Sequence, residues 1–248
     1  MSSLNGKVAI VTGSSRSLGA AIAKELASNG AQVVVNYAYS AGKAQEVLDH
    51  IKANGGDAIV VKADLGTEDG PQVLVDETVK AYGKIDIIVN NGGIWKYEPL
   101  GSIKASDFDT FFAVNVRGPM LLVQASLPYL QNNGRIINIS SIASRAGHAA
   151  SSIYGGTKAA LEAMSRAWAS ELGPTRNITS NSVGLGPLHT DMTAGAPEDV
   201  LQGMVAHAAL PRVGETSDIT DIVSFLASDK SHWITGDVIS ANGGSVFL

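Results

Sequence analysis

Short runs of apolar, mostly β-branched residues alternate along the chain with longer segments in which apolar residues recur every three or four positions. The runs cover residues 7–12, 32–36, 57–62, 85–90, 134–140, 178–183 and 238–240. Those before residue 178 are almost continuously apolar, which is typical of strands buried on both faces. Helical patterns lie between them, at about 18–29, 41–54, 68–82, 106–131, 152–172 and 216–228. The alternation predicts an α/β fold, a doubly wound, seven-stranded parallel sheet with helices on both faces.

The chain of 248 residues is predicted to form a single domain, because α/β folds of roughly 200–250 residues often do so. The segment from about residue 186 to 212 differs from the rest, since it is rich in Gly, Pro, Ala and His and only weakly periodic. We interpret it as a loop with a short helix that forms a lid over a ligand site. A surface excursion without a function is the alternative.

Charge and composition exclude several classes of function. The net charge of −5 gives the chain no general attraction for nucleic acid or anionic membranes. The lack of cysteine excludes disulfides and thiolate metal sites, and we expect no metal site. No apolar run approaches the roughly 18 residues of a membrane-spanning helix, and the N-terminus lacks the pattern of a signal peptide. We therefore expect a cytoplasmic protein.

A glycine turn follows the first predicted strand and leads directly into a helix. The turn reads Thr-Gly-Ser-Ser-Arg-Ser-Leu-Gly over residues 12–19. Such a turn lets backbone amides and the helix N-terminus face the pyrophosphate of a dinucleotide. A purely structural strand-to-helix turn is the alternative. The residues expected to contact a cofactor here are Gly13, Ser15, Arg16, Ser17, Leu18 and Gly19.

Tyr154 and Lys158 lie four residues apart in a helical segment, so they share one helix face. An ammonium group beside a phenol favours the phenolate by Coulomb attraction. We expect Lys158 to lower the tyrosine pKa from its ordinary value near 10, so that Tyr154 can act as general acid or base. Ser141 ends the preceding strand and lies 13 positions before Tyr154.

These motifs, in this order, resemble the short-chain dehydrogenase/reductase family over nearly the whole chain, from Lys7 to Gly244. The resemblance implies a single-domain Rossmann fold and hydride transfer between a nicotinamide and a carbonyl or alcohol carbon. Ser141 would then orient the substrate oxygen, and Asn115 would hold a water behind Lys158. The sequence departs from the family pattern at Ser17, where a glycine is usual, and at Leu185, where a proline is usual.

The same resemblance assigns further residues to the cofactor. Asp64 would bond the adenine amino group, although it could equally cap the next helix. Backbone near the adenine ribose would come from the stretch after the fourth strand, where Gly92 replaces an alanine. The carboxamide of the nicotinamide would be held by the segment after the sixth strand. The residues concerned are Asp64, Leu65, Asn91, Gly92, Gly93, Gly186, Pro187, Leu188 and Thr190, besides Tyr154 and Lys158.

The end of the second strand favours NADP(H) over NAD(H). An NAD site usually has an acid there, which contacts the ribose 2′-hydroxyl. Residues 35–40 read Val-Asn-Tyr-Ala-Tyr-Ser and contain no carboxylate. Arg16 can pair with a 2′-phosphate, and Asn36, Tyr37 and Ser40 can donate hydrogen bonds to it.

The substrate is predicted only as a class, a medium-sized apolar or aromatic ketone or alcohol. This follows from the residues expected to line the pocket: Trp95, Tyr97, His148, Ile153, Leu188, Met192 and Met204. Residues 35–40 resemble those of fungal polyhydroxynaphthalene and steroid reductases and of 3-oxoacyl carrier-protein reductases. In the family, the helix with Tyr154 and the long helix before it form a subunit interface, so we expect a homotetramer or homodimer.

Three alternatives are weighed against a ketone reductase. Enoyl reductases of related fold separate tyrosine and lysine by more positions. Sugar-nucleotide epimerases usually carry a longer C-terminal substrate region than the one that follows Gly186. A nucleotide-binding regulator or scaffold without turnover is the third, and the complete set of Asn115, Ser141, Tyr154 and Lys158 argues against it.

Overall fold

The computed structural model describes residues 4–191, 193–194 and 198–247. Seven parallel strands form one sheet in the order β3-β2-β1-β4-β5-β6-β7. The sheet confirms the predicted α/β class and its doubly wound topology. The strands are β1 (Val8–Val11), β2 (Gln32–Tyr37), β3 (Asp57–Lys62), β4 (Ile85–Asn90), β5 (Leu130–Ser141), β6 (Thr179–Leu185) and β7 (Val238–Ala241).

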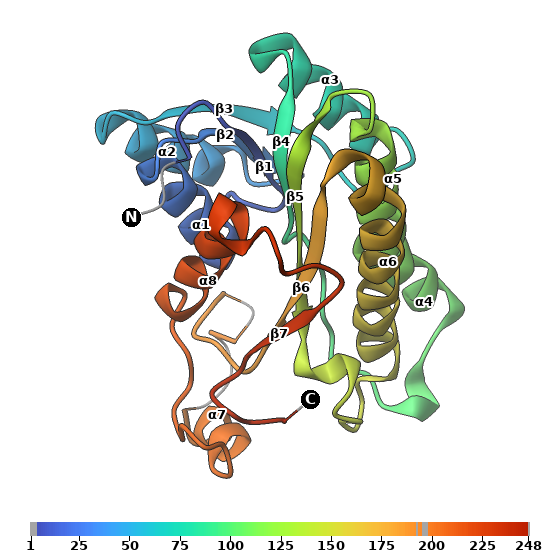
Figure 1. Ribbon diagram of the computed structural model, residues 1–248. Helices are drawn as coiled ribbons and strands as arrows, with labels where there is room; N and C mark the ends of the chain where they lie inside the picture. The colour runs from blue at the N-terminus through green and yellow to red at the C-terminus, as the bar shows by residue number, and fades with distance from the viewer. Residues whose placement is uncertain (1–3, 192, 195–197, 248) are drawn as a thin grey trace.

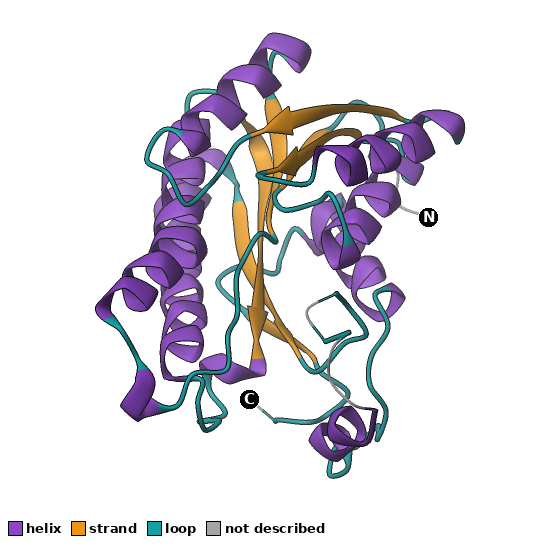
Figure 2. Ribbon diagram, turned by 180° about the vertical axis from the view of Figure 1, so that it is seen from behind, coloured by secondary structure: helices purple, strands orange, loops and turns teal. Residues whose placement is uncertain are grey.

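Helices cover both faces of the sheet, as Figures 1 and 2 show from opposite sides. Helices α1, α2 and α8 pack on one face, and α3, α5 and α6 pack on the other. The α-helices are α1 (Ser17–Ser28), α2 (Ala41–Ala53), α3 (Gly70–Tyr82), α4 (Ala105–Phe112), α5 (Gly118–Ser126), α6 (Ser152–Arg176), α7 (Glu198–Val205) and α8 (Ser217–Ala227). The shorter turns are η1 (Leu100–Ser102), η2 (Ala113–Arg117), η3 (Ile142–Ser144) and η4 (Asp229–Ser231).

The apolar runs form strands because consecutive side chains enter opposite layers. In β2, Val33 and Val35 pack in the layer with α1 and α2, whereas Val34 packs against the other layer. The same alternation in β1 sends Ile10 to one side and Val11 to the other. Each of these side chains is fully buried, so the central strands need apolar residues at every position.

The predicted helix over residues 106–131 is wrong as a single element. It is divided into α4, the π-helical turn η2 and α5, and it stops at Ser126. Pro128 explains the stop, because it has no N–H to donate to the carbonyl four residues earlier in a continued helix. Strand β5 then begins at Leu130, next to Ile85 of β4, earlier than the apolar run indicates.

The carboxyl ends of the strands form one edge of the molecule, and the strand order reverses there between β1 and β4. Ligands of doubly wound sheets bind in the crevice at such a switch point. Helix α7 lies apart from the two helical layers, at the end of the molecule where β5 ends (Figure 1). Within the described residues, no helix is long and apolar enough to cross a membrane.

Candidate active site

The glycine turn after β1 is shaped by two close backbone approaches. Gly13 has φ +61°, and a Cβ atom there would lie 2.9 Å from the Cα of Gly92. A Cβ atom on Gly19 would lie 2.4 Å from the carbonyl oxygen of Gly13, so neither position admits a side chain. Ser17 also has a positive φ, +52°, which suits the glycine that the family motif usually has there.

Thr12 connects this turn to the loop after β4. Its hydroxyl oxygen accepts the backbone N–H groups of Asn91 at 3.0 Å and Gly92 at 2.8 Å. The Asn91 amide in turn donates to the Thr12 carbonyl at 2.9 Å. The two loops on either side of the switch point therefore form one hydrogen-bonded unit, and sequence analysis did not assign Thr12 to it.

Asn36, at the end of β2, is buried, and its side chain does not have the expected role of a donor to the 2′-phosphate. Its Oδ1 atom accepts the Gly13 N–H at 3.0 Å, and its Nδ2 atom donates to the Ala63 carbonyl at 3.0 Å. Because its amide is engaged inside the protein, Asn36 orients the glycine turn and is not available as a donor to a 2′-phosphate.

Asp64 follows β3 and makes two contacts within the protein. Its Oδ1 atom accepts the Gly66 N–H at 2.9 Å, as a turn-forming acid does, and its Oδ2 atom accepts the Tyr39 hydroxyl at 2.5 Å. Tyr39 is otherwise exposed beside β2. Of the other predicted contacts in this region, Tyr37 and Ser40 are partly exposed and Leu65 is buried.

Ser141, Tyr154 and Lys158 come together beside the carboxyl end of β5. Ser141 is the last residue of the strand, and its hydroxyl oxygen accepts the Ala143 N–H at 3.2 Å. Tyr154 and Lys158 lie one turn apart on α6, with the lysine Nζ 5.7 Å from the centre of the tyrosine ring. Lys158 is buried and donates to the Ile139 carbonyl at 2.7 Å.

Burial dominates the electrostatics of this group. It raises the pKa of Tyr154 above its ordinary value, and a hydrogen bond with Ser141 lowers that pKa in part. Burial lowers the pKa of Lys158 to about 8, while the charge of Glu162 raises it. The expected lowering of the tyrosine pKa by Lys158 is therefore not observed, because desolvation of the phenolate has the larger effect.

Asn115 lies in the π-helical turn η2, a distortion that is frequent at functional sites. Its Oδ1 atom accepts the Ile94 N–H at 2.9 Å, and its Nδ2 atom donates to the Ile94 carbonyl and to the Thr157 hydroxyl at 2.9 and 3.1 Å. The turn thereby joins α6 to the loop after β4. A Cβ atom on Gly93 would lie 3.3 Å from Asn115 Oδ1 and 3.6 Å from Lys158 Nζ, so this glycine lies against both.

The connection after β6 folds back on itself through short hydrogen bonds. Leu188 is buried and forms a parallel bridge with Gly214. The Thr193 hydroxyl donates to the Leu188 carbonyl at 2.6 Å, and the Thr190 amide donates to the Thr193 hydroxyl at 3.0 Å. The residues predicted to hold the nicotinamide, Gly186, Pro187, Leu188 and Thr190, all lie in this connection.

The side chains predicted to line a substrate pocket differ in exposure. Trp95 and Tyr97 are 42% and 64% exposed, and Met204 on α7 is 60% exposed. Ile153 and Leu188 are buried, and His148 is exposed. Met192 lies outside the described residues.

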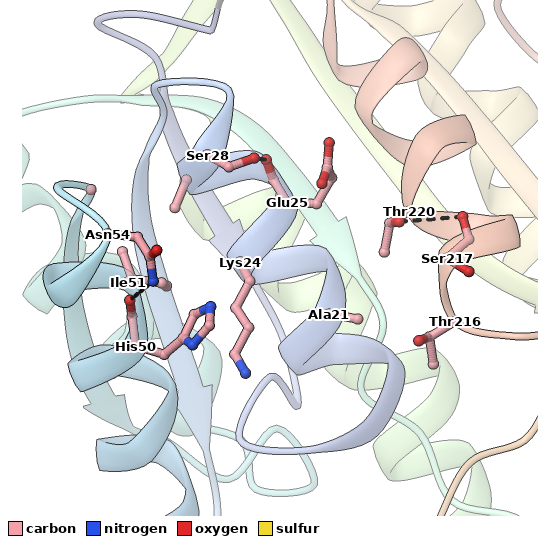
Figure 3. A pocket seen from close by; sticks show the side chains of 12 residues that line it. Ala21, Lys24, Glu25, Ser28, His50, Ile51, Asn54, Thr216, Ser217 and Thr220 are labelled. Atoms are coloured by element: carbon pink, nitrogen blue, oxygen red, sulfur yellow. Dashed lines mark hydrogen bonds between the residues drawn. The ribbon is translucent and has the colours of Figure 1, made fainter.

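A separate hollow of about 340 Å³ lies on the outer surface of the helical layer, between α1, α2 and the start of α8 (Figure 3). None of the predicted catalytic residues lines it; its polar side chains include Lys24, His50 and Thr216. Among the described residues, no group of three or more His, Cys, Asp or Glu side chains is placed to hold a metal ion.

Besides Thr12, four functional candidates were missed by sequence analysis, because each makes a contact between distant segments. Lys43 of α2 forms an ion pair with Asp191 of the lid, Thr157 contacts Asn115, and Glu162 contacts the end of β5 and the turn after it. The position of Glu162, four residues after Lys158, is the only one of these with a signal in the sequence.

Known proteins resemble this chain over almost its full length. The family model described as "Enoyl-(Acyl carrier protein) reductase" matches residues 13–245. Short-chain dehydrogenase/reductase FrzI of Cladobotryum sp is 46% identical over 98% of this chain and 97% of its own. Versicolorin reductase stcU of Emericella nidulans is 39% identical over 98% and 96%. The crystal structure of angucycline C-6 ketoreductase LanV with bound NADP superposes with a TM-score of 0.93, at 37% identity over 98% and 97%.

The fold, the site and the relatives together therefore define this chain as an oxidoreductase of the α/β class. The chain belongs to the short-chain dehydrogenase/reductase family.

Proposed function

We propose that this protein is an NADP(H)-dependent ketoreductase, which reduces a ketone to a secondary alcohol or catalyses the reverse reaction. The observation that supports this most directly is the grouping of Ser141, Tyr154 and Lys158 beside the glycine turn. The lysine Nζ lies 5.7 Å from the tyrosine ring, and the tyrosine hydroxyl bonds Ser141.

The glycine turn fits the pyrophosphate of a dinucleotide. Gly13 and Gly19 let the turn pack tightly on itself and on the loop after β4, where a Cβ atom would clash. Helix α1 begins after Arg16 with no side-chain cap and no acid in its first turn, so its first amides are available to an anion. Arg16 beside this helix supports NADP(H), and the LanV structure holds NADP.

When bound, the cofactor supplies the hydride. Tyr154 donates the proton to the carbonyl oxygen in reduction and removes it in oxidation. Ser141 donates a hydrogen bond to the same oxygen, which orients and polarises it. Lys158 favours the tyrosinate by its charge and would hold the nicotinamide ribose, and Asn115 would hold a water behind the lysine.

An apolar or aromatic ketone fits the exposed aromatic groups at this edge. Trp95 is 42% exposed and Tyr97 is 64% exposed, and Ile153 adds a buried apolar side chain. Relatives named versicolorin reductase and angucycline ketoreductase support the same class of substrate.

The chain is proposed to act in the cytoplasm, as one domain with residues 186–212 as the lid, and as a homotetramer or homodimer. Phe108 of α4 and Met120 of α5 are 46% and 41% exposed, which suits an interface along these helices. Light scattering on the purified protein measures the assembly.

The test is oxidation of NADPH, beside NADH, with a panel of aliphatic, aromatic, polycyclic and 3-oxoacyl ketones. An enoyl thioester belongs in the panel, because the matching family model is described as an enoyl reductase. We expect turnover of an aromatic ketone with NADPH, and a loss of about 10²–10⁴-fold in Tyr154→Phe with unchanged cofactor binding. Turnover of the enoyl thioester alone would contradict the ketone assignment, and tight NADPH binding without any turnover would favour a binding role.

A further inference from the structure

Asp191, in the lid, contacts the glycine turn and the start of α2 at once. Its Oδ2 atom lies 3.6 Å from Nε of Arg16 and 3.7 Å from Nζ of Lys43. Its backbone N–H donates to the hydroxyl oxygen of Ser17 at 2.9 Å. One lid residue is therefore attached through both its side chain and its backbone to the segments that surround the end of β2.

The two cations come from different elements and converge on one oxygen atom. Arg16 immediately precedes α1, and Lys43 lies in the first turn of α2. Both elements flank the end of β2, where the ribose 2′-phosphate of NADP(H) is expected. Arg16 and Lys43 thus form an anion site that is occupied by the protein's own carboxylate.

Ser17 explains why the lid is attached at this point. The family motif has a glycine there. A positive φ such as that of Ser17 is strained for residues other than glycine. A glycine has no hydroxyl to accept the Asp191 N–H. The departure from the motif therefore supplies the backbone attachment of the lid.

The ion pairs that attach the lid through Asp191 are weak enough to be replaced by contacts with a phosphate. The side chains of Arg16, Lys43 and Asp191 are 57%, 54% and 46% exposed, and ion pairs of such exposure contribute little. A phosphate monoester carries a charge of about −1.5 to −2 near neutral pH, against −1 for a carboxylate, and offers three acceptor oxygens. It is the stronger partner for the same two cations.

We propose that Asp191 competes with the 2′-phosphate of the cofactor for Arg16 and Lys43, so that a 2′-phosphorylated nucleotide releases the lid from the glycine turn. Lys43 is then a second ligand of the phosphate and a determinant of cofactor specificity. A nucleotide without the 2′-phosphate leaves Asp191 in place. This inference rests on the proposed NADP(H) function.

The test measures binding to the apoprotein by calorimetry, with adenosine 2′,5′-bisphosphate and adenosine 5′-monophosphate as probes. We expect Asp191→Asn to tighten binding of the bisphosphate about three- to tenfold, the size of two exposed ion pairs. Binding of the monophosphate should stay within about twofold. Lys43→Gln should weaken the bisphosphate by a similar factor, and Asp191→Asn should gain less in that background.

Asp199→Asn is the matched control. Asp199 is an exposed acid in the first turn of α7, so its substitution changes the net charge equally without touching Arg16 or Lys43. The gain of Asp191→Asn should also shrink between about 0.1 and 1 M salt, because screening weakens the competition.

Two failures are distinguishable. If the unmodified protein prefers the bisphosphate but Asp191→Asn behaves like Asp199→Asn, the competition is refuted and the cofactor assignment stands. If the unmodified protein binds both probes equally, the NADP(H) assignment fails and the inference fails with it.

Discussion

Glu162 is a buried carboxylate that joins the turn after β5 to α6. Its Oε1 atom accepts the hydroxyls of Ser140 and Ser144, each at 2.7 Å, and its Oε2 atom lies 3.4 Å from Nε of Arg145. Ser141 lies between the two anchored serines. We predict that replacing Glu162 lowers both the stability of the protein and the rate of the reaction.

The magnitude follows from the partners that remain. In Glu162→Ala, Ser144 can still donate to the Ser141 carbonyl at 2.8 Å, but the buried Ser140 hydroxyl has no second acceptor among the described residues. The unpaired hydroxyl and the lost packing cost about 2–4 kcal/mol of the free energy of unfolding. For a chain of this size, that lowers the melting temperature by roughly 5–15 °C. Glu162→Gln keeps an acceptor for Ser140 and loses the charge that pairs with the partly exposed Arg145 and acts on Lys158, which costs about 0.5–1.5 kcal/mol.

Turnover distinguishes positioning from stability alone. A displacement of Ser141 by about 1 Å is enough to lower kcat roughly 10²-fold, so Glu162→Ala should approach that loss at a temperature where it is folded. Glu162→Gln should lose much less. It should also move the alkaline limb of the pH profile to lower pH, because the charge of Glu162 raises the pKa of Lys158.

Thermal denaturation and steady-state kinetics on both variants, with the nicotinamide absorbance as readout, check these values. Equal melting temperatures for Glu162→Ala and Glu162→Gln would refute the hydrogen-bond argument. Unchanged kcat in a destabilised Glu162→Ala would show that the carboxylate does not position Ser141.

Two further substitutions test the balance between stability and function. Lys158→Met should raise the free energy of unfolding at pH 7 by about 1–3 kcal/mol while abolishing turnover, because burial holds the lysine pKa at about 8, below its ordinary 10.5. The unmodified protein should gain stability as the pH rises from about 8 to 10.5, where the unfolded chain retains the proton and the folded one has lost it, and denaturant unfolding of Lys158→Met should lack that rise. Gly13→Ala should cost more than about 2 kcal/mol and weaken nucleotide binding in calorimetry, since its Cβ would lie 2.9 Å from Gly92 at a positive φ; a stability within 0.5 kcal/mol of the original, on the order of a neutral surface change, would contradict this.

The central strands could be predicted closely because burial on both faces leaves a continuous apolar run. Strands β3 and β4 have the predicted bounds, 57–62 and 85–90. The division of the long helix over 106–131 could not be predicted, because the spacing of apolar residues does not reveal a π-helical turn. Its end could have been placed earlier, because Pro128 is visible in the sequence.

The motif residues of the site could be predicted as positions but not as contacts. The sequence could not reveal that the Asn36 amide faces inward to Gly13, or that Asp191 reaches Ser17 across 174 residues of chain. Nor could it reveal the sign of the Tyr154 pKa shift, because that depends on how far the phenol is desolvated against how closely charges approach it.

The π-helical turn at Asn115 restricts how this chain can vary. Such a turn contains one residue more than an α-helical turn would need, and each residue of an α-helix advances by about 100° around its axis. Deleting one residue from 113–117 would therefore restore a regular α-helical turn and leave the buried face of α5, with Leu122 and Val123, toward the sheet, but it would remove the bulge that places Asn115. Substitutions can accumulate on either side of this turn, whereas loss of its extra residue would change the position of Asn115 without changing the packing of α5.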